Sequence, residues 1–212
     1  MAFQLFTYPT RETTLPLRVA HGHFATSHSH INYYIDLTMT KHRLSEAREA
    51  AIELGSKFKT STIVDTILCL DGTEVIGACM ASELTKNGLH NMNQHKTIYV
   101  VTPEHTTGSQ LIFRDNTAPM IVGKHVLILA ASVTTGYTVQ AAVEAIRYYR
   151  GTPVGVCSIF TMLDNCAGFP VVSIFPSNVI DDYRSTPSHE CPMCKAGQKL
   201  DALVNTYGIS SL

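Results

Sequence analysis

Residues 126–138 read Val-Leu-Ile-Leu-Ala-Ala-Ser-Val-Thr-Thr-Gly-Tyr-Thr, which predicts a strand, a turn and the start of a helix. The run from Val126 to Ala130 is apolar throughout, which is typical of a strand buried on both faces of a parallel sheet. From about Tyr137 to Tyr149 the apolar residues recur at helical spacing. The turn between them therefore lies at the positive end of a helix dipole, where backbone N–H groups can face an anion.

This turn predicts a binding site for a phosphate monoester. Small hydroxyl side chains and a glycine let backbone donors and threonine oxygens converge on one phosphate. It is not a Walker loop, because no Gly-Lys-Ser/Thr sequence occurs in it. A different interpretation is that Thr134 or Thr135 only caps the helix, as hydroxyl residues often do. The candidate phosphate-binding residues are Ser132, Val133, Thr134, Thr135, Gly136, Tyr137 and Thr138.

Strands and helices alternate along the rest of the chain, which indicates an α/β fold with a central, mostly parallel sheet flanked by helices. In such sheets ligands bind beyond the carboxyl ends of the strands. The loops after residues 70, 101, 131 and 160 are therefore the expected places for chemistry. The expected strands are 62–70, 97–101, 109–113, 125–130, 154–160 and 171–175, and the expected helices are 46–54, 74–86 and 137–149.

The sequence suggests three segments. Residues 1–44 form a small N-terminal hood, irregular except for a β-type run from Ile31 to Leu37. Residues 45–185 form the core, which begins with a helix that Ser45 can cap. Residues 186–212 form a C-terminal tail with a Cys-x2-Cys motif and a short helix.

Composition limits the classes of partner. The chain has 212 residues with 16 Lys and Arg against 17 Asp and Glu, and its formal net charge of -1 gives no overall attraction to nucleic acid or anionic membranes. Its longest apolar run, Val126 to Val133, is far shorter than the roughly 18 residues that suggest a membrane span. The N-terminus lacks the pattern of a signal peptide. We therefore expect a cytoplasmic protein that does not bind nucleic acid directly and has no disulfide framework.

Several segments resemble type I phosphoribosyltransferases, and in particular their orotate phosphoribosyltransferase-like branch. Residues 126–138 are similar to the strand and Thr-Thr-Gly loop that bind phosphoribosyl pyrophosphate (PRPP) in that family. The other matching segments, in the expected order, are the N-terminal hood at 22–24 and 29–36, the pyrophosphate loop at 70–78 and a cysteine-containing tail at 191–197.

The resemblance implies transfer of phosphoribose from PRPP to a nucleobase, orotate or another pyrimidine, with Mg2+ as cofactor. It implies a homodimer, a role in pyrimidine nucleotide metabolism, and PRPP or a nucleoside 5'-monophosphate as ligand. Residues 102–110 would close as a lid. Phe24, Tyr33 and Tyr34 would stack on the base or form the hood's own core. The pyrophosphate loop would comprise Asp71, Gly72, Thr73 and Glu74.

Three departures from the family pattern weaken the expectation of catalysis. Ala130 and Ala131 stand where the family has two carboxylates that hold the ribose hydroxyls. The stretch 97–113 has no Lys or Arg, and Tyr137 replaces a common second glycine. The chain could therefore be a noncatalytic, regulatory protein that binds PRPP or a nucleotide. If it is an enzyme, the groups that could compensate are Asp71, Glu74 and His105, and also Glu104 and Asp115.

The tail offers candidate metal ligands. His189, Cys191 and Cys194 lie within six residues, and Cys-x2-Cys lets two thiolates meet one zinc ion. A fourth ligand would have to come from Cys157, Cys166, a remote histidine or a second subunit. A redox pair and inert thiols are the alternatives. The histidines His21, His23, His28 and His30 could also bind a divalent metal, or could only reflect the polar composition of a loop.

Overall fold

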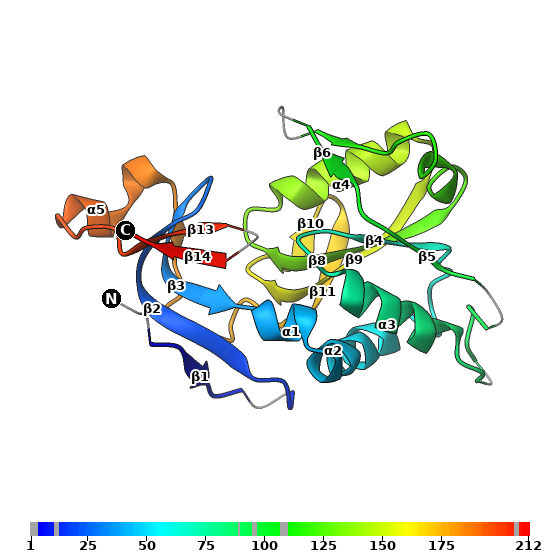
Figure 1. The fold of residues 1–212 in the computed structure, drawn as a ribbon, viewed down its shortest axis with the longest axis horizontal. Helices are drawn as coiled ribbons and strands as arrows, with labels where there is room; N and C mark the ends of the chain where they lie inside the picture. Colours follow the sequence, from blue (N-terminus) through cyan, green and yellow to red (C-terminus); the bar gives the residue numbers. More distant parts are fainter. Residues whose placement is uncertain (1–3, 11–12, 89, 95–96, 107–109, 206–207) are drawn as a thin grey trace. The chain divides into compact units, whose positions relative to one another are not determined.

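The computed structural model describes residues 4–10, 13–88, 90–94, 97–106, 110–205 and 208–212 (Figure 1). The chain divides into two compact units, one made of residues 1–39 and 178–212 and the other of residues 40–177. The tail, expected from the sequence as a segment of its own, thus shares a unit with the N-terminal hood. The reason is long-range strand pairing, which local sequence patterns do not report.

The unit 40–177 is built on a sheet in the order β10-β11-β9-β8-β4-β5. Only the pairing of β10 with β11 is antiparallel, and the other neighbours in this sheet are parallel. This confirms the predicted α/β class. The strands are β4 (Thr66–Cys69), β5 (Tyr99–Val101), β8 (His125–Val133), β9 (Thr152–Thr161), β10 (Asn165–Cys166) and β11 (Phe169–Phe175).

Helices cover both faces of this sheet (Figure 1). Helix α4 (Tyr137–Tyr148) packs on β8 and β9 through Val139, Ala142 and Ile146, which repeat at helical spacing and are buried. On the other face α2 (Leu44–Ser56) contacts β9 and β11, and α3 (Glu74–Thr85) contacts β4 and β5. None of the helices in the described residues is long and apolar enough to span a bilayer.

The predicted start of α2 is wrong by two residues, because the helix begins at Leu44 and not at Glu46. Arg43 is its N-cap residue, with an extended backbone, and its carbonyl accepts the first helical bond from the N–H of Ala47 at 2.9 Å. Ser45 lies inside the helix. The helix therefore begins without a side-chain cap, and its stability comes from the buried face that contains Ala47, Ala50 and Leu54.

The unit 1–39 with 178–212 contains an antiparallel-rich sheet in the order β12-β3-β2-β13-β14, with β1 paired to β2. The expectation that residues 1–44 are mostly irregular is wrong, because β2 and β3 form a long hairpin. Strand β13 pairs with β2 across the sequence and binds the tail to the hood. The strands are β1 (Phe6–Tyr8), β2 (Leu17–Ala25), β3 (His30–Asp36), β12 (Ser185–Thr186), β13 (Ala202–Asn205) and β14 (Gly208–Ser211).

The strand order in the unit 40–177 changes direction between β4 and β8. After β4 the chain adds β5 on one side, whereas β8, β9 and β11 follow on the other side. Such a reversal is the position at which open parallel sheets bind ligands, beyond the carboxyl ends of the strands. The loop 70–73 after β4 and the loop 134–136 after β8 both lie at that edge.

Candidate active site

The turn after β8 requires a glycine at Gly136. This residue is the N-cap of α4 and has a left-handed backbone with φ of 80°. A Cβ at this position would also lie 2.7 Å from Sγ of Cys166 and 3.2 Å from the side chain of Leu163. Glycine is thus needed both for the backbone conformation and for space. It allows the chain to turn sharply from the strand into the helix, so that the first N–H groups of α4 face outward.

The hydroxyl groups beside this turn are not used as caps. The alternative that Thr134 or Thr135 caps α4 is wrong, because Gly136 is the N-cap and no side chain bonds to the first helical turn. Ser132, Thr135 and Thr138 are exposed. In the part of the chain that the structure describes, their hydroxyls and that of Thr134 make no side-chain hydrogen bond. These hydroxyls, with the first N–H groups of α4, which have no acceptor within the helix itself, can therefore donate to an anion.

The loop after β4 has an unusual backbone. Asp71 and Gly72 have φ of 58° and 78°, and a left-handed conformation is costly for a residue with a Cβ. Thr73 stabilises the turn, because its buried hydroxyl bonds the carbonyls of Leu70 at 2.9 Å and of Leu129 at 3.1 Å. Since Leu129 belongs to β8, this threonine ties the candidate pyrophosphate loop to the strand that carries the phosphate turn.

Lys41 is a site residue that the sequence analysis missed. Its Nζ donates to the carbonyl of Asp71 at 2.9 Å, although the residue is largely buried. Burial raises the pKa of the Asp71 carboxyl, while the positive charges of Lys41 and His105 oppose this rise. A lone lysine in the short helix α1 (Thr38–His42) carries no sequence signal. The structure therefore places a cation at the candidate pyrophosphate loop, and this contact could not be assigned from the sequence.

The expected lid begins as a hairpin. Strand β6 (Glu104–His105) pairs with β7 (Leu111–Ile112), and residues 107–109 of the lid lie outside the described residues. At its base, Thr102 donates to Oε1 of Glu74 at 3.0 Å, so the hairpin lies against the pyrophosphate loop.

Arg114 follows β7 at the same base of the hairpin and is paired with Glu104. Two N–H groups of Arg114 donate to the two carboxylate oxygens of Glu104 at 2.6 Å each. These bonds hold the pKa of Glu104 below its ordinary value. Asp115 also acts on Arg114 electrostatically. Glu104 and Asp115 were expected as possible replacements for the two carboxylates, and both interact with Arg114.

The two alanines are buried near the carboxyl end of β8. Ala130 and Ala131 have 1% and 5% of their surface exposed, and they precede the phosphate turn on β8. Ala130 lies opposite Ser158 of β9, whose Oγ is buried and has no hydrogen-bond partner among the described residues. The sheet therefore offers two methyl groups and an unpaired hydroxyl at the base of the site.

The candidate base-stacking residues are corrected in part. Phe24 and Tyr34 are buried and pack with Ala20, Ile31 and Ala202 in the core of their own unit. Their rings meet edge to face with centroids 6.2 Å apart. They therefore offer no free face to a base, and the alternative that they form the hood's core is the one observed. Tyr33 is only half-buried and packs on His21.

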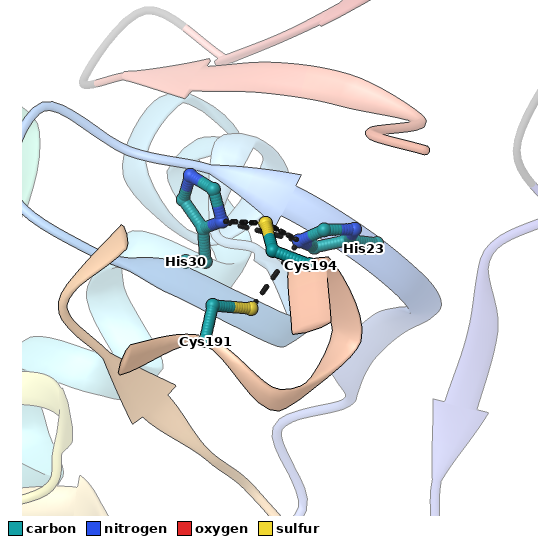
Figure 2. Close-up of side chains that lie close together, drawn as sticks. All are labelled: His23, His30, Cys191 and Cys194. Atoms are coloured by element: carbon teal, nitrogen blue, oxygen red, sulfur yellow. Dashed lines mark hydrogen bonds between the residues drawn. The ribbon is translucent and has the colours of Figure 1, made fainter. Parts of the chain in front are cut away.

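The structure brings Cys191 and Cys194 together with remote histidines, one of the open alternatives, and not with His189. His189 is exposed and pairs with Glu190. The ligand atoms of Cys191 and Cys194 instead lie near those of His23 and His30, all within 4.8 Å of one another (Figure 2). Cys157 and Cys166 bond to backbone carbonyls of the other unit.

Comparisons with known proteins show a partial sequence match and a shared fold. No protein-family model matches the chain. Over 75 residues it is 35% identical to orotate phosphoribosyltransferase of Caldanaerobacter subterraneus subsp. tengcongensis, a match that covers 35% of this chain and only 38% of that enzyme.

Solved structures match over most of the chain. The orotate phosphoribosyltransferase of Mycobacterium tuberculosis H37Rv superposes with a TM-score of 0.52 and 17% identity, over 78% of this chain and 93% of that one. The chain adopts the type I phosphoribosyltransferase fold. Orotate phosphoribosyltransferase of Aeropyrum pernix gives a TM-score of 0.51 with 18% identity, over 85% of this chain and 93% of that one. The homodimer and the cytoplasmic location that the sequence led us to expect remain predictions.

Proposed function

We propose that this chain binds PRPP and transfers its phosphoribosyl group to a nucleobase, with slow turnover. The observation that carries the proposal is the turn at Gly136. Exposed hydroxyls and the first N–H groups of α4 lie beside it, and the loop containing Asp71 follows the neighbouring strand. Two anion-binding loops on adjacent parallel strands suit a ligand with a phosphate at one end and a pyrophosphate at the other.

The reaction needs little covalent chemistry from the protein. A ring nitrogen of the base loses its proton to solvent and forms a bond to C1' of the ribose while the bond from C1' to the pyrophosphate oxygen breaks, and pyrophosphate leaves with the electron pair. Residues 132–138 would hold the 5'-phosphate. The loop 71–74 and Lys41 would receive the pyrophosphate, because the ammonium group lies 2.9 Å from the carbonyl of Asp71. Holding both ends of PRPP orients C1' toward the base.

The residues present fit a Mg2+ ion that enters with the pyrophosphate. Magnesium prefers oxygen ligands and usually keeps several waters in addition to one or two carboxylates. Asp71 and Glu74 are the carboxylates of the loop, and Glu74 is fixed by the hydroxyl of Thr102. When bound, the ion would neutralise charge on the leaving pyrophosphate.

Slow turnover follows from Ala130 and Ala131, which cannot hold the ribose hydroxyls or stabilise positive charge on the ribose. A preorganised group of this kind is often worth about 3 to 4 kcal/mol in the transition state. The same observation supports a second candidate, a protein that binds PRPP or a nucleoside 5'-monophosphate without turnover. The similarity to orotate phosphoribosyltransferase supports the enzyme, with orotate as the first base to test.

Phosphorus NMR distinguishes the two candidates. The chain is mixed with PRPP and Mg2+, then with orotate, uracil or adenine in turn. We expect broadened PRPP signals in each case and free pyrophosphate only in the presence of orotate. Broadening without base-dependent pyrophosphate would favour the binding protein instead. Gly136→Ala is the control variant, because its Cβ would meet Cys166 and strain the turn. Unchanged PRPP signals with the unmodified chain would contradict both candidates.

A further inference from the structure

The cluster of His23, His30, Cys191 and Cys194 lies in the unit 1–39 with 178–212 and takes no part in the proposed reaction (Figure 2). The two histidines come from the β2–β3 hairpin. Cys191 directly precedes the short helix α5 (Pro192–Lys195), and Cys194 lies within it. Within the described ranges, it is the one group of three or more His, Cys, Asp and Glu side chains with ligand atoms this close. The side chains point toward one another from both segments.

The distances between these ligand atoms match those around one tetrahedral ion. Nε2 of His23 lies 3.1 Å from Nδ1 of His30, 3.4 Å from Sγ of Cys191 and 3.6 Å from Sγ of Cys194. Sγ of Cys194 lies 3.3 Å from Nδ1 of His30. Zinc bond lengths and tetrahedral angles require about 3.3 Å between two nitrogens and about 3.6 Å between nitrogen and sulfur. The four atoms thus surround a position of the size of one zinc ion.

A hydrogen bond on the far side of His23 prepares its ring for a metal. Nδ1 lies 3.0 Å from the carbonyl of Gln198 and 3.2 Å from that of Lys199. Since a carbonyl can only accept, Nδ1 must carry the proton. This tautomer leaves the lone pair of Nε2 directed at the cluster. A backbone carbonyl in this position is the usual outer partner of a histidine that binds zinc.

The backbone around His23 is shaped to aim its side chain. The β2–β3 pairing shifts register between His21 and Phe24, so this stretch of β2 is bulged. Asp201 holds the bulge, because its carboxylate accepts the N–H of His23 at 2.7 Å and its own N–H donates to the carbonyl of His23 at 2.8 Å. His23 is fully buried, as is Cys191. A buried imidazole beside a buried thiol is costly unless its polar atoms are paired or bind a metal.

We propose that His23, His30, Cys191 and Cys194 bind one structural Zn2+ ion. Four protein ligands close the coordination sphere, which is the arrangement of structural and not of catalytic zinc. The ion would join the hood to the C-terminal tail. The histidine ligands of the hood and the cysteine ligands of the tail are more than 160 residues apart along the chain. The proposal does not depend on the proposed transferase activity, since none of the four residues belongs to the loops 71–74 or 132–138.

Metal analysis of the full chain, purified without chelator, tests the proposal. We expect about one zinc per chain for the unmodified protein and for His189→Ala, which removes the exposed histidine next to the motif. We expect His30→Ala and Cys194→Ser to retain less than about a tenth of that amount. Equal zinc content in all four proteins would overturn the assignment. Zinc in none of them, even after addition of Zn2+, or a disulfide between Cys191 and Cys194, would also overturn it.

X-ray absorption at the zinc edge tests the same site without any variant. We expect two sulfur atoms at about 2.3 Å and two nitrogen atoms at about 2.0 to 2.1 Å from the metal. This measurement remains decisive if a cysteine variant fails to fold. A first shell of oxygen atoms, or of four sulfurs, would contradict the four ligands named here.

Discussion

Replacing Ala130 and Ala131 together by aspartate should raise kcat for phosphoribosyl transfer by about 100-fold or more. The two positions precede the phosphate turn on β8, at the edge where β4 and β8 present their loops. Carboxylates there can accept hydrogen bonds from the ribose hydroxyls and stabilise the positive charge that develops on the ribose ring. The gain is measured as pyrophosphate release from PRPP, Mg2+ and orotate.

A carboxylate at residue 130, a buried position in an apolar core cluster, would have one possible hydrogen-bond donor beside it. Ser158 lies opposite Ala130 on β9, and its buried hydroxyl has no partner within the described segments. Neighbouring strands are about 4.8 Å apart, so this hydroxyl can donate to the new side chain. The matched control is Ala130→Asn with Ala131→Asn, which has the same shape without the charge and should give little gain. If the aspartate variant folds and binds PRPP but turns over no faster, the proposed cause of slow catalysis is wrong.

Removing zinc should lower the thermal midpoint of the unit 1–39 with 178–212 by at least about 15 °C. A ligand present at 1,000 times its Kd stabilises the folded state by about 4 kcal/mol, and each kcal/mol shifts the midpoint of a small domain by about 4 to 8 °C. The unit has a small core of its own, centred on Phe24, Tyr34 and Ala202. Calorimetry with and without a chelator measures the shift.

Re-addition of metal provides the control for this stability experiment. Zn2+ should restore the original midpoint, whereas Mg2+ should not, because thiolate ligands favour the softer ion. In Cys194→Ser the chelator should have almost no effect, since the site has already lost a ligand. An equal midpoint for the unmodified chain before and after complete removal of zinc would show that no structural ion stabilises this unit.

Local patterns sufficed to predict the strand, the turn and the helix between His125 and Tyr148, while phosphate binding at this turn stays a prediction. The apolar run of β8 and the helical spacing of α4 are separated by three residues, so neighbouring side chains alone determine this part of the fold. The sequence alone also shows that Ala130 and Ala131 stand where the family that it resembles has two carboxylates. It could not show whether the threonines cap the helix. That depended on Gly136 taking the N-cap position.

The histidine partners of the cysteines could not be assigned from the sequence. His23 reaches the cluster through a β-bulge that Asp201 holds, and this contact joins residues 178 positions apart. The adjacent His189 was the natural expectation from spacing, but it faces solvent. The contact of Lys41 with Asp71 could not be predicted for a similar reason, because it links a short helix to a loop that is distant in the sequence.

Backbone amide NMR on the 23.2 kDa chain gives the most direct test of the claim that the loop 132–138 binds a 5'-phosphate. Ribose 5-phosphate is titrated into the labelled protein, with ribose as the control. We expect the largest shifts at the N–H groups of Thr135, Gly136, Tyr137 and Thr138, saturating with concentration, and no such shifts with ribose. Shifts located elsewhere, or equal shifts with ribose, would contradict the assignment of this turn as the phosphate site.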